Sequence, residues 1–421
     1  MNAQKMFAVT VMSVIASALG DPVVSDVTVR QRWPWSRKVD IDYKLAGDVG
    51  AINDIEISAS NGTSAVNITS AALSGDVNGV EPGTHRITWD PMVDGYTDAA
   101  LASFTVSLTA KKVPSYMIID LVTGAKSYRY EWDNLTWCNT DEYKTTNMVF
   151  RHIRAGDFLF GTMKSGDLLP SDHANANEFH AHTVHVSTDY WMAVFETTQK
   201  QYETLMGENP STWAHCDTRP VDTVPCITKM RWCTYPDAYN SIQFSPEALD
   251  ERGFTGRLSA KAGVKADLPW EYQWEYAVRA GTHWPFFMEN IYVNADSGVI
   301  GQYIRYASNT PNTSNFSLGP DDGGPARVGS YLPNNWGLYD TCGNVWEVCL
   351  DGYIAASLDA EKPEATDEFE AMNVGYSKRV GKGGGFNSGA NWVRCSTRAD
   401  VVVGDGADQA VGFRVVVKYE E

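Results

Sequence analysis

The feature that most constrains the fold is a change of hydrophobic pattern along the chain. Up to Lys112, apolar and polar residues alternate in short runs, and Gly, Asp, Asn and Pro separate these runs. The clearest runs are VTVRQRWPWSRKVDIDYKLAG, INDIEISAS, THRITWDP and SFTVSLTA. A period of two residues is typical of antiparallel strands that bury one face. The first part of the chain is therefore predicted to be an antiparallel β-domain.

We predict that residues 21–112 form a β-sandwich of the immunoglobulin or fibronectin type, because several short strands divided by turns are typical of that architecture. The segment contains no cysteine. It also lacks any spacing of side chains that would hold a metal. Its expected role is that of a spacer or docking module.

The rest of the chain is predicted to form a second domain, because 421 residues exceed one ordinary core. Residues 113–149 are expected to connect the two domains. From Phe150 onward Trp, Gly, Asn and Pro are frequent, which indicates long loops. Two helices are expected, in TTQKQYETLMG (197–207) and in PWEYQWEYAVRAGT (269–282), since cap residues and glycine stops flank them.

The first twenty residues have the pattern of a secretory signal peptide. Lys5 precedes an apolar run from Met6 to Ile15, and Ala18 and Gly20 fit a cleavage site before Asp21. The run is too short for a membrane span, and no later stretch is long and apolar enough to form one. We expect residues 1–20 to be removed and the protein to be exported to the periplasm, the cell surface or the exterior.

The charge of the chain argues against nucleic acid as a partner. The formal net charge is −18 at pH 7, and an acidic surface repels a phosphate backbone. A protein or glycan ligand is the expected class of partner.

Seven cysteines are present, and an odd number leaves at least one free or paired outside the chain. Export permits disulfides. Cys226 with Cys233, and Cys342 with Cys349, are possible bridges, but the sequence does not fix the pairing. No CxxC pair indicates a zinc site.

Seven motifs from Phe150 to Lys418 occur in an order that resembles the formylglycine-generating enzyme family, also called the sulfatase-modifying factor family. They are FLFG (158–161), VFETTQKQYETLMGENPS (194–211), RPVDTV (219–224), LPWEYQWEYAVRAGT (268–282), NNWGLYDTCGNVWEVCLDGY (334–353), KGGGF (382–386) and VGFRVV (411–416). The resemblance implies an irregular α+β domain over residues 150–418 that is related to the C-type lectin fold.

Enzymes of this family oxidise a cysteine to formylglycine with O₂ and Cu(I), which two cysteines after the glycine motif hold. Counted from Phe386, the two cysteine positions of the family fall on Ser388 and Val393. A serine or a valine cannot supply the soft thiolate that Cu(I) requires. Cys395 lies two residues further on and is the remaining candidate for a catalytic thiol. Copper is therefore not expected as a cofactor.

Calcium is the cofactor that the resemblance does imply. Carried over onto NNWGLYDTCGNVWEV, the ligands would be the side chains of Asp340 and Glu347 and the carbonyl groups of Gly343 and Val345. Oxygen donors in an irregular loop suit Ca²⁺. The alternative is that Asp340 caps the loop and Glu347 forms a buried ion pair.

Two functions remain open. In the first, the protein is a non-catalytic member that binds a protein, peptide or glycan through its C-terminal loops, including residues 400–409, since binding residues concentrate on loops. The candidate binding residues are Asn387, Ser388, Asn391, Trp392, Arg394 and Arg398. In the second, the protein is an oxidase that modifies protein or small-molecule thiols in the manner of the family.

Overall fold

The structure is a computed structural model of the chain. It describes residues 21–32, 35–96, 103–130, 137–162, 178–231, 249–288, 291, 297–353, 378–402 and 408–420. The predicted signal peptide, Cys233 and residues 403–407 of the C-terminal stretch lie outside the described residues.

The chain divides into two compact units. The first runs to Ser115 and takes in a short return that starts at Tyr128, while the second holds Tyr116–Ser127 and the rest of the chain. The division lies just beyond Lys112, where the alternating pattern ends. The segment 113–149, expected as a connection, contributes strands to the second unit because SYMIIDL and NMVF are apolar enough to enter its main sheet.

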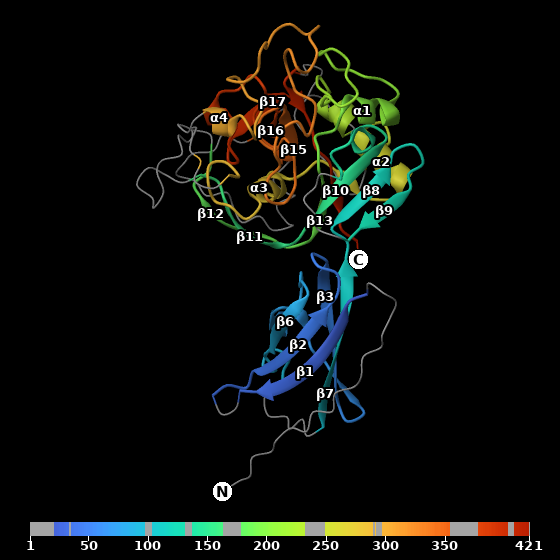
Figure 1. Ribbon diagram of the computed structural model, residues 1–421, viewed down its shortest axis with the longest axis vertical. Coiled ribbons are helices and arrows are strands. Elements are labelled where there is room, and N and C mark those ends of the chain that lie inside the picture. The colour runs from blue at the N-terminus through green and yellow to red at the C-terminus, as the bar shows by residue number, and fades with distance from the viewer. Residues whose placement is uncertain are drawn as a thin grey trace, which may run out of the picture. The chain divides into compact units, whose positions relative to one another are not determined.

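The first unit consists of two antiparallel sheets, drawn in blue in Figure 1. One has the strand order β1 (Val23–Gln31), β2 (Val39–Ala46), β6 (Gly83–Trp89) and β5 (Leu73–Gly75). The other has the order β4 (Ser64–Val66), β3 (Ile52–Asn61) and β7 (Phe104–Val113). A single 3-10 turn, η1 (Ser70–Ala72), precedes β5.

Both sheets of the first unit contribute to one apolar core. Ile41 and Trp89 come from the first sheet, and Ile55 and Phe104 come from the second. The rings of Trp89 and Phe104 are stacked with centroids 5.5 Å apart. The alternating runs are thus strands that bury one face, as predicted. Kinship with immunoglobulin or fibronectin domains stays a prediction.

The second unit contains three sheets joined by long loops. The largest has the order β14 (Ala266–Asp267), β19 (Val416–Lys418), β13 (Tyr190–Ala193), β10 (Asn147–Ile153), β8 (Tyr116–Asp120) and β9 (Lys126–Arg129). The second sheet has the order β17 (Arg398–Val402), β16 (Lys378–Lys382), β15 (Trp346–Gly352) and β18 (Val411–Gly412). A hairpin-like pair, β11 (Gly156–Phe160) and β12 (His182–Val186), is the third.

The helices of this unit are short. They are α1 (Gln199–Met206), α2 (Phe254–Ala262), α3 (Glu271–Arg279) and α4 (Ser297–Ile300), with the single turns η2 (Asp141–Lys144), η3 (Cys226–Met230) and η5 (Ala390–Trp392). The prediction for α1 is confirmed: the Thr198 side chain accepts the N–H of Gln201, and Gly207 ends the helix with a φ of +77°. No helix among the described residues is long and apolar enough to cross a membrane.

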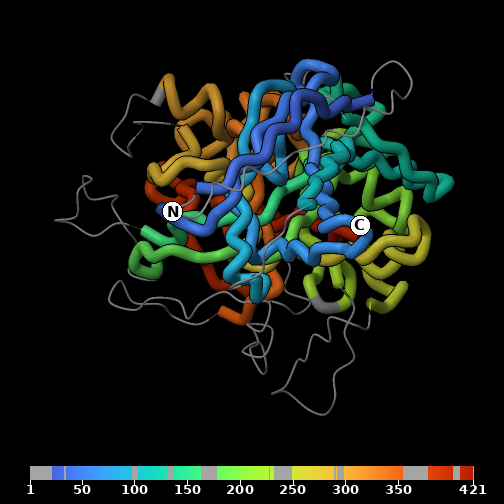
Figure 2. Tube along the Cα trace, turned by 90° about the horizontal axis from the view of Figure 1, so that it is seen from below, coloured from blue at the N-terminus to red at the C-terminus, as the bar shows by residue number. Residues whose placement is uncertain are grey.

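Helix α3 organises the part of the unit that holds the motifs. Its buried face packs into an apolar core that also contains Val380 of β16, Cys349 of β15 and Cys395 of the C-terminal loop. Long segments lie between the short strands and helices of this unit, and Figure 2 follows the chain through them as a tube. The predicted loop-rich α+β character is therefore observed, and the relation to C-type lectins stays a prediction.

Candidate functional site

The glycines of KGGGF form the turn by which the chain leaves β16. Gly383 and Gly384 have φ angles of +86° and +77°, a region that side chains with a Cβ rarely adopt. A Cβ on Gly384 would lie 2.5 Å from the carbonyl oxygen of Trp392 and 2.6 Å from Cγ1 of Val393. The glycines therefore allow the backbone to pass directly against the loop formed by residues 387–397.

The two positions expected for copper-binding cysteines hold this loop together. The Ser388 Oγ accepts a hydrogen bond from the Gly385 N–H at 3.0 Å. The Ser388 N–H in turn donates to the Gly385 carbonyl at 2.9 Å. The Val393 side chain is fully buried in the core around α3. A serine that closes a turn and a valine in a core offer no ligand for Cu(I).

Cys395 has a thiol partner that the spacing of the motifs did not reveal. Its side chain is completely buried, and it interacts through a hydrogen bond with Cys342, which precedes Gly343 in a different loop and is equally buried. Cys342 and Cys395 are not joined by a disulfide and remain thiols. Cys342 thus lies beside Cys395, whereas the sequence had suggested Cys349 as its partner.

Two cations lie near this thiol pair and affect its protonation. Burial raises the pKa of Cys395, but the hydrogen bond with Cys342 and the charges of Arg279 and Lys382 outweigh burial and lower it below the ordinary thiol value. Burial raises the pKa of Cys342 well above that value. The pair is therefore asymmetric, with the negative charge favoured on Cys395.

Glu275 of α3 binds the same two cations. Its carboxylate accepts hydrogen bonds from Arg279 Nη2 at 2.7 Å and from Lys382 Nζ at 2.9 Å. The Lys382 and Glu275 side chains have no exposed surface. The network ties α3 to β16 directly below the glycine turn.

Two of the six predicted binding residues lie inside the protein. Arg394 forms an ion pair with Glu178, and neither side chain is exposed. Arg398 forms another with Glu271 of α3 and is equally enclosed. Their guanidinium groups hold the C-terminal loop to the core and do not face solvent.

The other four predicted residues form the outer side of the loop. Trp392 is 37% exposed, and its ring meets that of Trp346 edge to face at 6.4 Å. Asn387 is exposed, while Ser388 and Asn391 are half-buried. The outer side of the loop thus presents an indole and two amides from a short, pinned segment.

The predicted calcium ligands are engaged with protein groups. The Glu347 carboxylate accepts hydrogen bonds from Arg414 Nη2 at 2.7 Å and from Trp274 Nε1 at 2.6 Å. Asp340 Oδ2 accepts the N–H of Gly329 at 2.6 Å, and its Oδ1 is buried without a hydrogen-bond partner. Burial raises the pKa of Asp340 to about 6.

These donors do not fit a calcium site well. A positively charged Arg414 fills the place beside Glu347 that a cation would need. Within the described residues, no three His, Cys, Asp or Glu side chains could share one metal ion. Asp340 Oδ1 is the only side-chain oxygen of the predicted set without a hydrogen-bond partner, and a calcium titration decides between the predicted metal and the ion pair.

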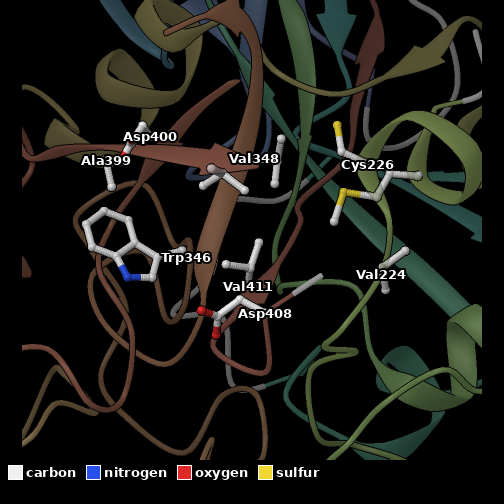
Figure 3. A pocket seen from close by; sticks show the side chains of 10 residues that line it. Val224, Cys226, Trp346, Val348, Ala399, Asp400, Asp408 and Val411 are labelled. Carbon is white, nitrogen blue, oxygen red and sulfur yellow. The ribbon is translucent and has the colours of Figure 1, made fainter. Parts of the chain in front are cut away.

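A cavity lies on the side of Trp346 where β15, β17 and β18 meet η3, and Figure 3 shows it from close by. Its volume is about 190 Å³. The inner wall consists of Val224, Cys226, Met230, Val348 and Val411. Trp346, Ala399, Asp400 and Asp408 line it as well.

Sequence reasoning missed Cys342 as the partner of Cys395, Glu178 as the partner of Arg394, and the cavity. The partners of Cys395 and Arg394 lie far from them in the chain, and no local spacing indicates them. One signal was available for the cavity: the stretch 400–409 follows the loop directly, and three of its residues, Asp400, Val401 and Asp408, line the cavity.

Comparison with known proteins identifies relatives of the second unit. A family model described as the Sulfatase-modifying factor enzyme 1-like domain matches residues 136–419. The chain is 27% identical over 244 residues to the chaperone protein LppX of Paenibacillus barcinonensis, covering 54% of this chain and 80% of that protein. It is 31% identical over 153 residues to a formylglycine-generating enzyme of Streptomyces coelicolor, covering 35% of this chain and 45% of the enzyme.

Among solved structures, Treponema denticola variable protein 1 is similar to this chain with a TM-score of 0.45 and 19% identity, covering 65% of this chain and 96% of that one. The chain thus spans less than half of the Streptomyces enzyme and most of the Paenibacillus chaperone.

Proposed function

We propose that this chain, which belongs to the sulfatase-modifying factor enzyme 1-like domain family, is an exported, non-catalytic member that binds a protein or peptide through its C-terminal loop. The formylglycine-generating chemistry requires an accessible pair of thiolates. Ser388 and Val393 stand at the positions of that pair, and both have structural contacts instead. This observation carries the proposal.

The exposed side of the loop supplies the proposed binding surface. Trp392 offers a large, partly exposed ring, and aromatic side chains are frequent anchors in protein interfaces. Arg394 and Arg398 support the segment from within. A loop held by buried ion pairs loses little conformational entropy when it binds, which favours affinity.

A protein or peptide is favoured over a glycan as the ligand. The relative from Paenibacillus barcinonensis is named a chaperone protein, and the alignment with it spans 80% of its length. A chaperone acts by holding another polypeptide, so its name supports a polypeptide ligand for this chain.

Selection from a random-peptide phage library tests this function. We expect the purified chain to enrich peptides whose binding to Trp392→Ala is at least about tenfold weaker. Leu332→Ala is the matched control, because Leu332 is 48% exposed on the same unit and lies outside the loop. Failure to enrich any peptide, or equal binding to both variants, would contradict the proposal.

A second function remains as the alternative, since Cys342 and Cys395 form a thiol pair. Two sulfur ligands can hold Cu(I), and an oxidase of thiols would need such a site. The burial of both sulfurs argues against an oxidase function, because a substrate thiol must reach the metal or the nucleophile. The pair fits a role in the core better than a role in catalysis.

A further inference from the structure

We propose that the cavity beside Trp346 receives a basic side chain of the ligand, with an aliphatic stem inside and a cationic head at Asp408. The inference rests on the proposed function and names the chemistry of the group that is bound. It is drawn from the apolar wall, the volume and the charge of the cavity.

The inner wall is apolar and deep. Val224, Met230 and Val348 belong to one apolar core of the second unit and are at most 2% exposed. Figure 3 shows Cys226 and Trp346 on opposite sides of the cavity. Such a wall favours methylene groups, because the removal of apolar surface from water is favourable.

The cavity is large enough for a side chain. An apolar cavity of roughly 150 Å³ admits a benzene ring, and this one measures about 190 Å³. The stem of a side chain placed in this volume would gain van der Waals contacts with the surrounding wall.

Asp408 supplies the charge. One of its carboxylate oxygens accepts the N–H of Ala410 at 2.8 Å, and its carbonyl accepts the N–H of Val411 at 3.0 Å, which fixes the residue at the mouth of the cavity. Asp400 lines the same cavity but is already paired with Lys378. Within the described residues, Asp408 has no cationic partner, so it is the group that a basic ligand would neutralise.

Trp346 adds to the preference for a cation. The face of an indole ring attracts an ammonium or guanidinium group that lies within about 6 Å of the ring centroid. The net charge of −18 also draws basic ligands toward the protein. A neutral apolar side chain would make the same contacts with the apolar wall. It would also partly desolvate the Asp408 carboxylate without neutralising its charge.

The test compares n-hexylamine with 1-hexanol, which have the same chain length and differ in charge at neutral pH. Dissociation constants come from saturation-transfer NMR on the full chain. We expect the amine to bind at least about five times more tightly than the alcohol. Equal affinities, or no binding of either compound, would overturn the inference.

Three variants locate the binding. Asp408→Asn keeps the acceptor for Ala410 and should remove the preference for the amine. Asp322→Asn removes the same charge from an exposed position outside the cavity and should leave the preference unchanged. Ala399→Phe should fill the mouth of the cavity and lower the affinity for both compounds by at least about tenfold. A preference that survives in Asp408→Asn, or affinities unchanged in Ala399→Phe, would refute the assignment.

The result is separable from that of the peptide selection. If peptides are enriched but the amine shows no preference, the binding function stands and the cavity assignment fails. If the amine binds as expected and no peptide is enriched, the cavity is a site for small amines and the proposed function fails.

Discussion

Arg394 and Glu178 form an ion pair in which neither side chain has any exposed surface. Ser396 Oγ donates to Glu178 Oε2 at 3.0 Å, and Arg394 Nε donates to the Asn391 carbonyl at 3.0 Å. A guanidinium predicted to meet a ligand therefore anchors the loop from inside. Arg394 therefore contributes to the stability of the loop and is not part of its exposed binding surface.

Arg394→Met should destabilise the protein strongly, because it leaves the Glu178 charge buried and unpaired. Losing one partner of a buried pair costs about 3–5 kcal/mol. Urea unfolding measures the difference. Asn387→Ala, on the exposed side of the same loop, should change the free energy of unfolding by less than about 0.5 kcal/mol. Similar values for the two variants would show that the ion pair does not anchor the loop.

The glycine turn makes a second prediction about stability. In Gly384→Ala, the new Cβ would be attached to a residue with a φ of +77° and would clash with the carbonyl oxygen of Trp392. The free energy of unfolding should therefore fall by more than about 2 kcal/mol. Gly207→Ala has the same φ of +77° but open space around its Cβ position, and should cost about 1 kcal/mol. Thermal or urea unfolding of both variants provides the comparison. Equal costs would mean that the close approach to Trp392 is unimportant.

Much of the fold was predictable from local pattern. The alternating runs before Lys112 are strands, and Thr198 with Gly207 sets the ends of α1, because caps and periodicity act over a few residues. The order of the seven motifs indicated the family that the second unit belongs to. These signals are local or sequential, and a single sequence contains them.

The site was harder to predict because its contacts join distant segments. Arginines are usually exposed, so nothing near Arg394 or Arg398 indicated that Glu178 and Glu271 would enclose them. The approach of Cys342 to Cys395 depends on how two loops pack on α3. Such contacts follow from tertiary packing and not from spacing along the chain.

Asp222 predicts a pH dependence of stability. Burial raises the pKa of this carboxyl from 3.8 to about 6, despite hydrogen bonds from Thr223 and Thr212. The folded state then holds its proton more tightly than the unfolded state, so stability falls as pH rises from about 4 to about 6 and levels off above that. The contribution amounts to about 3 kcal/mol.

Asp222→Asn should remove this contribution. Urea unfolding of both proteins at about pH 4.5 and about pH 7 isolates it, because the other carboxyl groups cancel in the comparison. We expect the variant to gain stability relative to the wild type on going to the higher pH. A difference between the two proteins that does not change with pH would contradict the raised pKa.

Calcium provides a test of the Asp340 loop. The family resemblance predicts a rise in Tm with calcium, whereas the ion pair of Glu347 with Arg414 predicts none. We expect the ion pair to prevail, so that millimolar CaCl₂ and EGTA give the same Tm within about 1 °C. A rise of several degrees with CaCl₂, lost in Asp340→Asn, would establish the calcium site instead.

The most direct test of the non-catalytic proposal is a Cu(I) titration of the reduced, purified chain, with Cys395→Ser and Cys342→Ser as controls. Because Ser388 and Val393 stand at the positions expected for the accessible thiolates, and because Cys342 and Cys395 are buried, we predict no tight one-to-one binding and no copper-dependent consumption of O₂ with a thiol peptide. Tight one-to-one binding that either cysteine variant abolishes, together with O₂ consumption, would contradict the proposal and make the chain an oxidase.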